Sequence, residues 1–303
     1  MTPRVYEMTP RVYEVTHRTQ YRYDGEVTAS YGLAHLLPRD APGQRVRRSR
    51  LQVDPQPDLI AERSDYFGNR CGYLEVHRPH TELVVTAVSV VEISRTAADL
   101  AALDAWTVGQ AARPAGGPVE DGLDALDFLL PSEQVSFDPA VQAYAAAVLA
   151  PGRPLGQALA DLVHRINADI AYVPGATSVT TPLREVLDRR HGVCQDFAHL
   201  AVGCLRLAGL PARYVSGYLE TRPPAGLPRL QGADASHAWL SVLVPELGWV
   251  DLDPTNDQPA DARYVVTAWG RDYTDVPPLK GVIFTESGAS TLTVGVDVIR
   301  LDR

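Results

Sequence analysis

The chain has 303 residues and a formal charge of −9 at pH 7, with 45% hydrophobic and 21% charged residues. This length is about twice that of a typical domain, so it predicts one large domain or two modest ones, and we expect two. No apolar run approaches the roughly 20 residues of a membrane-spanning helix, and no membrane association is expected. The acidic balance argues against a nucleic-acid partner, because proteins that bind the phosphate backbone carry basic surfaces.

Three cysteines occur, Cys71, Cys194 and Cys204, in a chain too long to depend on disulfides, which fits a reducing compartment. The N-terminus lacks a basic stretch followed by an apolar core, so no secretory signal is predicted and a cytoplasmic location is expected. The first seven residues, MTPRVYE, are repeated without change in the next seven. Seven residues are too few for a structural repeat unit, and residues 1–7 are not expected to contribute to the fold.

Hydrophobic periodicity divides the chain into four parts. Residues 8–93 alternate mostly with a period of two between Gly, Pro, Asp and Asn turns, which predicts a β-rich N-terminal domain. Residues 94–136 are rich in Ala, Asp, Gly and Pro, a composition typical of a linker with weak helical pieces. Residues 137–275 form the predicted second domain. Residues 276–303 contain STLTVGVDVIRL, a clean alternation typical of a strand that could join the sheet of either domain.

Within residues 137–275, helices are expected before strands. Asp138 and Pro139 are typical of a helix start, and apolar residues at helical spacing predict a second helix over about 155–170. A short helix is expected after Pro182, and another from Cys194 to the AGLP stop. Three segments rich in β-branched and aromatic residues follow, ARYVSGYLE, SHAWLSVLV and GWVDLD, which predict an antiparallel sheet and an α+β domain.

The start of the helix at Cys194 could activate a thiol. Cysteine is among the most buried residue types, so a core position is the simplest alternative for Cys194. A thiol of ordinary pKa, about 8.5, is only a few per cent thiolate at neutral pH. The HGV turn before Cys194 would leave it at a helix N-terminus, where unpaired amides and the helix dipole favour a thiolate and can bind an oxyanion. Cys204 is expected in the core and Cys71 in a strand or turn.

A catalytic thiol also needs a base and a group that orients the base. His237 stands at the start of SHAWLSVLV, and Asp251 and Asp253 lie on one face of the next segment, GWVDLD. A simple hairpin around the four-residue PELG connection would place His237 opposite Asn256, so a contact with Asp253 requires a bulge or bend. The spacing alone leaves open whether these residues form a triad or whether His237 is a polar residue with a structural partner.

Three segments together resemble the bacterial transglutaminase-like superfamily, whose core is papain-like: TPLREVLDRRHGVCQDFAHLAVGCLRLAGLPARYVSGYL, DASHAW and GWVDLDPTN, in that order. The resemblance extends over nearly the whole chain beyond residue 7 and includes the β-rich first third. It implies an α+β fold in which a papain-like transglutaminase core, helices and then an antiparallel sheet, follows the family's β-rich N-terminal domain.

By motif, the resemblance implies a role for three residues. Cys194 in GVCQDF would be the nucleophile, His237 in SHAW the base, and Asp253 in DPTN the carboxylate that orients the imidazole. Asp253 is favoured over Asp251 also because Pro254 cannot donate to a strand ladder, so the chain can bend there and direct the preceding carboxylate at a neighbour. Asp251, inside the strand, is expected to face solvent or a surface cation.

The chemistry implied by the resemblance is acyl transfer or hydrolysis at a peptide-like amide through a thioester, so we expect a peptidase or amidase with a peptide or protein substrate. Two alternatives stay open: an amide-forming or cross-linking transglutaminase, and a non-catalytic module that binds a peptide or protein on the same fold. The motifs do not distinguish water from an amine as the acyl acceptor.

Two aromatic residues, Tyr172 and Trp239, could line the acyl site or could be plain packing. No Walker loop, dinucleotide fingerprint or paired C-x-x-C motif occurs, so no cofactor and no metal ion are expected. Asp196 and His199 lie on the helix that follows the nucleophile, and they are expected to make helix-capping or structural hydrogen bonds.

Overall fold

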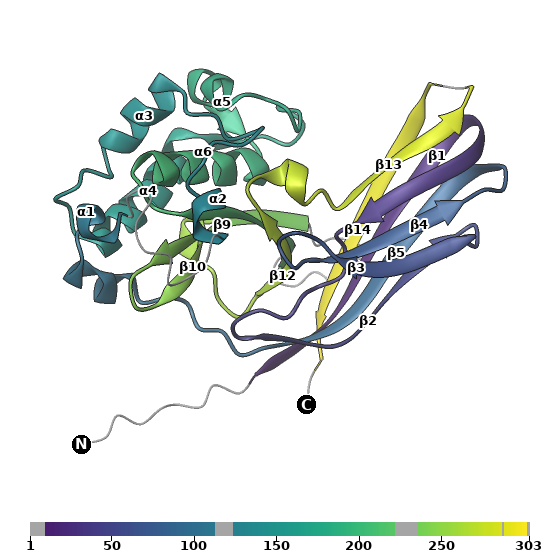
Figure 1. Ribbon diagram of the computed structural model, residues 1–303, viewed down its shortest axis with the longest axis horizontal. Coiled ribbons are helices and arrows are strands. Elements are labelled where there is room, and N and C mark those ends of the chain that lie inside the picture. Colours follow the sequence, from purple (N-terminus) through teal and green to yellow (C-terminus); the bar gives the residue numbers. More distant parts are fainter. Residues whose placement is uncertain (1–9, 113–123, 222–235, 287, 302–303) are drawn as a thin grey trace, which may run out of the picture.

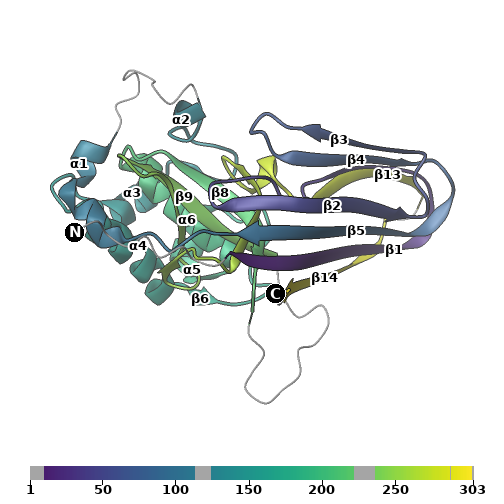
Figure 2. The ribbon, with the colours of Figure 1, turned by 90° about the horizontal axis from the view of Figure 1, so that it is seen from below.

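A computed structural model describes residues 10–112, 124–221, 236–286 and 288–301. Figure 1 shows a layer of helices over one sheet, beside a second sheet of longer strands, and Figure 2 shows these longer strands side by side. The first copy of MTPRVYE lies outside the described residues, so its expected exclusion from the fold is untested.

The N-terminal domain is a seven-stranded sheet centred on one long strand. Its first five strands have the order β2-β5-β1-β4-β3, and β13 and β14 also pair with β1, both antiparallel. The closing segment therefore joins the N-terminal sheet, which answers a question that the sequence left open. The strands are β1 (Arg11–Ala34), β2 (Gln44–Asp54), β3 (Leu59–Ser64), β4 (Arg70–Val76), β5 (His80–Ile93), β13 (Leu279–Thr285) and β14 (Ser290–Arg300).

Short helical pieces follow the first five strands, as the composition of residues 94–136 predicts. The structure has η1 (Leu100–Ala105), α1 (Val108–Ala111) and α2 (Asp124–Asp127) there, while residues 113–123 lie outside the described part. Thr107 begins α1 with a capping box, in which its hydroxyl accepts from the Gln110 amide and the Gln110 side chain accepts from the Thr107 amide.

The second domain has helices followed by an antiparallel sheet, as predicted. The helices are α3 (Pro139–Ala146), α4 (Leu155–Asp169), α5 (Leu183–Arg189) and α6 (Cys194–Leu207). Two short strands, β6 (Ala171–Tyr172) and β7 (His191–Gly192), form a parallel pair before α6. The sheet has the order β11-β10-β9-β8-β12, in which the β12 edge strand was not expected. Its members are β8 (Ala212–Leu219), β9 (Ser236–Val244), β10 (Gly248–Asp253), β11 (Gln258–Pro259) and β12 (Tyr264–Gly270), and η2 (Tyr273–Asp275) follows.

The main core lies between the helices and this sheet. Leu159, Leu162 and Ile166 form the buried stripe of α4 and are fully excluded from solvent, as their helical spacing predicts. Cys204 of α6 is buried in the same cluster, as expected. Burial of each large aliphatic side chain stabilises the domain by about 1.5–3 kcal/mol. None of the described helices is long and apolar enough to cross a membrane.

Two amide side chains of the N-terminal domain cover the open edge of β12. The Gln44 side chain accepts from the Val266 amide at 2.8 Å and donates to the Val266 carbonyl at 2.7 Å. The Asn69 side chain likewise accepts from the Trp269 amide at 2.9 Å and donates to the Trp269 carbonyl at 2.8 Å. These contacts satisfy backbone groups that an edge strand leaves unpaired, and they fix the N-terminal sheet against the second domain.

Candidate active site

Cys194 is the first residue of α6, and a local hydrogen-bond network fixes its position. Val193 is the N-cap, and its amide donates to Oδ2 of Asp196 at 2.8 Å, while the Thr177 hydroxyl donates to the same oxygen at 2.6 Å. A Cβ on Gly192 would lie 2.8 Å from that oxygen, so the turn before Cys194 requires glycine. The thiol is partly exposed at the positive end of the helix dipole, as the sequence predicts.

His237 lies on β9 and faces Asp253 at the end of β10. Nε2 of His237 is 2.7 Å from Oδ2 of Asp253, and both side chains are almost fully buried. Because Nε2 faces the carboxylate, Nδ1 is the ring nitrogen left for Cys194.

The expected register between these strands needs a correction. Gly248, at a positive φ of 73°, pairs directly with Val244, so the connection has three residues between the strands instead of four. The pairing stays regular up to Leu252 and Leu240 and contains no bulge. The required bend comes after the strand, because the chain turns at Pro254 and Asp253 already pairs with Gln258 of β11.

The Asp253 carboxylate is completely buried and accepts hydrogen bonds on both oxygens. Oδ1 accepts from the amides of Thr255 at 2.9 Å and Asn256 at 3.2 Å. Oδ2 accepts from the Tyr264 hydroxyl and the Asn256 side-chain amide, each at 2.7 Å, as well as from His237. Sequence reasoning missed Tyr264, since a tyrosine on an unexpected strand carries no motif signal, whereas Asn256 stands inside the DPTN segment and could have been found there.

These contacts set the charge of His237. Burial by itself lowers the pKa of His237, but the hydrogen bonds with Asp253 and Cys194 outweigh it and raise the pKa to about 10. Burial also raises the pKa of Asp253, and the hydrogen bonds from His237, Asn256 and Tyr264 reverse this and lower it. At neutral pH the pair is therefore an imidazolium beside a carboxylate, with the Cys194 thiol as the next neighbour.

Asp251, the other carboxylate on β10, lies away from His237. It forms an ion pair with Arg95, which also donates to the Tyr264 carbonyl at 2.9 Å. The expectation that Asp251 faces a cation is met, although the pair is largely buried and connects the linker to the second domain.

The two aromatic candidates differ in their access to the site. Tyr172 is 53% exposed, and burial and, to a smaller extent, Cys194 raise its pKa, so a contact of Tyr172 with substrate stays a prediction. Trp239 is fully buried beneath the histidine, with ring centroids 6.1 Å apart. Of the two alternatives left open for Trp239, its burial supports packing, because Trp239 points to the same side of β9 as His237 and lies under the imidazole instead of at the surface.

Asp196 and His199 both make the expected local contacts. Asp196 caps α6 as described above, and Nε2 of His199 accepts from the Tyr273 amide at 3.1 Å. Burial lowers the pKa of His199 to about 4, so it is neutral and has a structural role.

A cleft of about 270 Å³ opens beside Cys194 and His237 and is lined by both domains. This volume is slightly below the roughly 300–1,000 Å³ of small-molecule sites. Gln195, Tyr214 and Ser236 line it from the second domain. The other wall belongs to the N-terminal sheet and consists of residues from β1, β13 and β14 or beside them: His17, Thr19, Tyr21, Pro278, Leu279, Leu292 and Val294.

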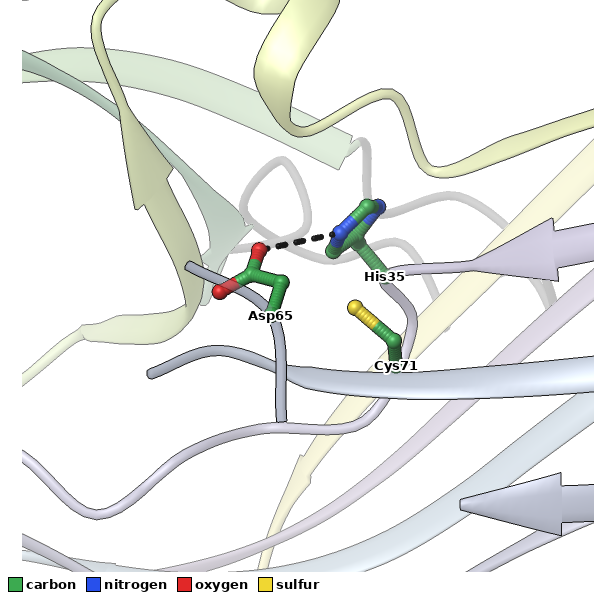
Figure 3. A group of neighbouring side chains, drawn as sticks. All are labelled: His35, Asp65 and Cys71. Atoms are coloured by element: carbon green, nitrogen blue, oxygen red, sulfur yellow. Dashed lines mark ion pairs between the residues drawn. The ribbon is translucent and has the colours of Figure 1, made fainter. Parts of the chain in front are cut away.

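A separate group of metal-ligand residue types lies in the N-terminal domain. The potential ligand atoms of His35, Asp65 and Cys71 are within 4.8 Å of one another (Figure 3). Nδ1 of His35 is 3.1 Å from the Pro277 carbonyl, and Nε2 forms a 3.3 Å ion pair with Asp65. Asp65 also accepts two hydrogen bonds from Asn69 at 2.8 Å each. Since the Pro277 carbonyl and the ion pair with Asp65 hold the histidine, and Asn69 binds the carboxylate, we assign this group a structural role.

Comparison with known proteins relates both domains to one family. Residues 13–92 match the bacterial transglutaminase-like N-terminal region, and residues 142–254 match the transglutaminase-like superfamily. An uncharacterized protein of Mycobacterium tuberculosis is 47% identical over 291 residues, covering 93% of this chain and 91% of that protein. A Mycobacterium leprae protein is 36% identical over 290 residues, covering 94% and 97%.

One solved structure is similar over nearly the whole chain, and one further relative is similar over about a third of it. A crystal structure of a Cytophaga hutchinsonii protein is similar with a TM-score of 0.78 at 21% identity, covering 98% of this chain and 92% of that chain, which supports the fold. A protein-glutamine gamma-glutamyltransferase of Pseudomonas aeruginosa is 35% identical over 124 residues, which are 34% of this chain and 18% of that protein.

Proposed function

Because the chain belongs to the transglutaminase-like superfamily, we propose that it is a cysteine peptidase or amidase that cleaves a peptide-like amide through a thioester on Cys194. The observation that carries the proposal is the 2.7 Å contact between His237 and Asp253, next to a cysteine at the start of a helix. A buried imidazolium and a helix N-terminus both favour the thiolate, which is the reactive form of cysteine.

In the first step, the Cys194 thiolate attacks the carbonyl carbon of the amide. The backbone N–H of Cys194 is among the four amides that a helix leaves unpaired at its N-terminus, so it can donate to the developing oxyanion. His237 gives its proton to the leaving nitrogen, the C–N bond breaks, and an amine or ammonia departs. Cys194 then carries the acyl group as a thioester, and the imidazole is neutral.

In the second step, His237 accepts a proton from water as the water attacks the thioester. The C–S bond breaks, the acid is released, and the thiolate–imidazolium pair is restored. Asp253 keeps the imidazole in the tautomer that presents Nδ1 to Cys194, and it stabilises the imidazolium formed in each cycle.

An amine could replace water in the second step, and the product would then be a new amide. The name of the Pseudomonas aeruginosa relative, a protein-glutamine gamma-glutamyltransferase, favours this as the second candidate. The two functions share every residue of the first step and differ only in what resolves the thioester.

Alkylation of the thiols tests the shared first step. Iodoacetamide should modify Cys194 at pH 6 clearly faster than it modifies a free thiol such as N-acetylcysteine, and His237→Ala should remove this excess. His164→Ala on α4, an exposed histidine paired with Asp257, is the matched control and should leave the rate unchanged. Cys71 and Cys204 are buried and should stay unmodified in the same digest. A rate at Cys194 no higher than that of the free thiol at pH 6 would contradict an activated nucleophile.

A peptide library, incubated with and without a primary amine, then identifies the reaction. Product masses that gain water indicate a hydrolase, and masses that retain the amine indicate a transferase. An activated Cys194 with no turnover of any amide would support a binding module instead.

A further inference from the structure

We propose that the N-terminal sheet forms a binding subsite for an uncharged, apolar side chain in the acyl part of the amide that Cys194 attacks. The proposal rests on the proposed function and adds a substrate class to it. It assigns the N-terminal domain a direct part in specificity.

The subsite wall consists of two paired strands. Thr19 and Tyr21 of β1 lie opposite Val294 and Leu292 of β14, respectively, and all four line the cleft beside Cys194. Leu279, at the start of β13, adds a further aliphatic side chain to the same wall. The N-terminal sheet therefore presents a mostly apolar surface to the nucleophile, contributed by residues that are far apart in the sequence.

The aliphatic face of β14 continues from the domain interface into this cleft. Val296 and Val298 are buried there against Tyr218 and Val265 of the second domain. Leu292 and Val294 occupy the same face, since residues two apart on a strand point the same way. They are 53% and 46% exposed, so this part of the face lacks the cover that Val296 and Val298 have. An apolar group bound in the cleft would cover it.

The described walls of the cleft are also uncharged apart from the catalytic groups. Among the described residues that line it, none is an aspartate, glutamate, lysine or arginine. Burial lowers the pKa of His17 to about 4, so this histidine is neutral. A charged side chain would lose its hydration here without gaining a counter-ion, whereas an apolar side chain would gain free energy from burial.

A second cavity extends the apolar surface away from Cys194. It has a volume of about 170 Å³ and shares Tyr21 and Leu279 with the cleft. Tyr23, Leu83 and Ile283 contribute to its lining, and Lys280 is the charged residue beside them. The two cavities together offer room for an apolar side chain next to the reacting amide and for an extension of the substrate beyond it.

Chloromethyl ketones test the subsite, because the thiolate displaces chloride and records how the neighbouring side chain binds. The rate constants for modification of Cys194 are measured with the N-acetyl-leucyl, aspartyl and lysyl reagents, each relative to chloroacetamide. The leucyl reagent should react at least about tenfold faster than either charged one.

Val294→Lys should reduce this preference and speed up the aspartyl reagent relative to the lysyl one. Ile299→Lys is the matched control, because Ile299 is equally exposed at 46% and lies on the opposite face of β14. It should leave the profile unchanged. Equal rates for all three reagents in the wild type would overturn the subsite, and so would the same profile in both lysine variants. In either case, a fast reaction with chloroacetamide would still support the proposed function. A slow reaction with chloroacetamide itself would overturn both.

Discussion

The hydroxyl of Tyr264 donates to Oδ2 of Asp253 at 2.7 Å, and this is the same oxygen that faces His237. The tyrosine is fully buried on β12, and it accepts a hydrogen bond from the Gln258 side chain at 2.7 Å. The edge strand of the core sheet thereby supports the proposed catalytic carboxylate at the oxygen that also faces the imidazole.

Tyr264→Phe should therefore lower the free energy of unfolding by roughly 1–3 kcal/mol, because it leaves a buried carboxylate with one donor fewer and the Gln258 amide without its acceptor. Urea unfolding measures the change. Tyr66→Phe is the matched control, since Tyr66 is 77% exposed and its pair with Asp127 lies in solvent, so the change should stay within about 0.5 kcal/mol. Equal stabilities of the two variants would show that the Tyr264 hydroxyl adds nothing.

The two carboxylates of β10 should separate catalysis from stability. Asp253→Asn keeps the shape of the side chain but disturbs the imidazole tautomer, and turnover of a substrate found in the library should fall by about two to four orders of magnitude. Asp251→Asn should leave turnover nearly unchanged and lower the free energy of unfolding by roughly 1–3 kcal/mol, because it weakens the buried pair with Arg95. Equal turnover of wild type and Asp253→Asn would refute the role of this carboxylate.

Much of the fold was predictable because local signals agree with it. Asp138 caps α3, the apolar stripe of residues 155–170 forms α4, and the HGV turn does begin α6 at Cys194. The family and the α+β class that the motifs implied are confirmed by the comparisons and the structure.

The features that could not be predicted lie where distant segments meet. An alternating pattern predicts a strand but not the strand that it pairs with, so the place of β14 beside β1 could not be predicted. The apolar wall that β14 forms with Tyr21 could not be predicted for the same reason. Trp239 is two residues after His237 and therefore lies on the same face of β9, which the sequence alone could place at the surface. Only the position of β12 shows that Tyr264 covers this face. The contact of His237 with Asp253 depends on a turn after β10 that strand periodicity does not describe.

The contact between the domains can be tested by an isosteric change. Gln44→Glu keeps the acceptor for the Val266 amide but removes the donor to the Val266 carbonyl, and it introduces a buried charge that repels this oxygen. The free energy of unfolding at pH 7 should fall by about 2 kcal/mol or more. Gln52→Glu, farther along β2 on an exposed position, should have little effect. Since protonation of the new carboxyl restores a donor, the loss should shrink below pH 5, and a loss independent of pH would argue against this contact.

The ion pair of His35 with Asp65 should make stability depend on pH in the alkaline range. Burial lowers the pKa of His35, but the hydrogen bonds with Asp65 and Cys71 outweigh it and raise the pKa to about 9. The unfolded chain has an ordinary histidine pKa of about 6.5, so the folded state binds the proton more tightly. The stabilisation is therefore fully present below pH 6.5 and is lost as the pH rises through 9.

The advantage of the wild type over His35→Gln in urea unfolding should accordingly shrink by about 3 kcal/mol between pH 6 and pH 9.5. Subtracting the two proteins removes the contribution of the other groups that titrate in this range. His164→Gln removes a histidine whose ion pair with Asp257 is exposed to solvent, and it should change the pH dependence far less than His35→Gln does. If the difference between wild type and His35→Gln does not change with pH, His35 is not protonated in the folded state, and the hydrogen bond to the Pro277 carbonyl alone accounts for its burial.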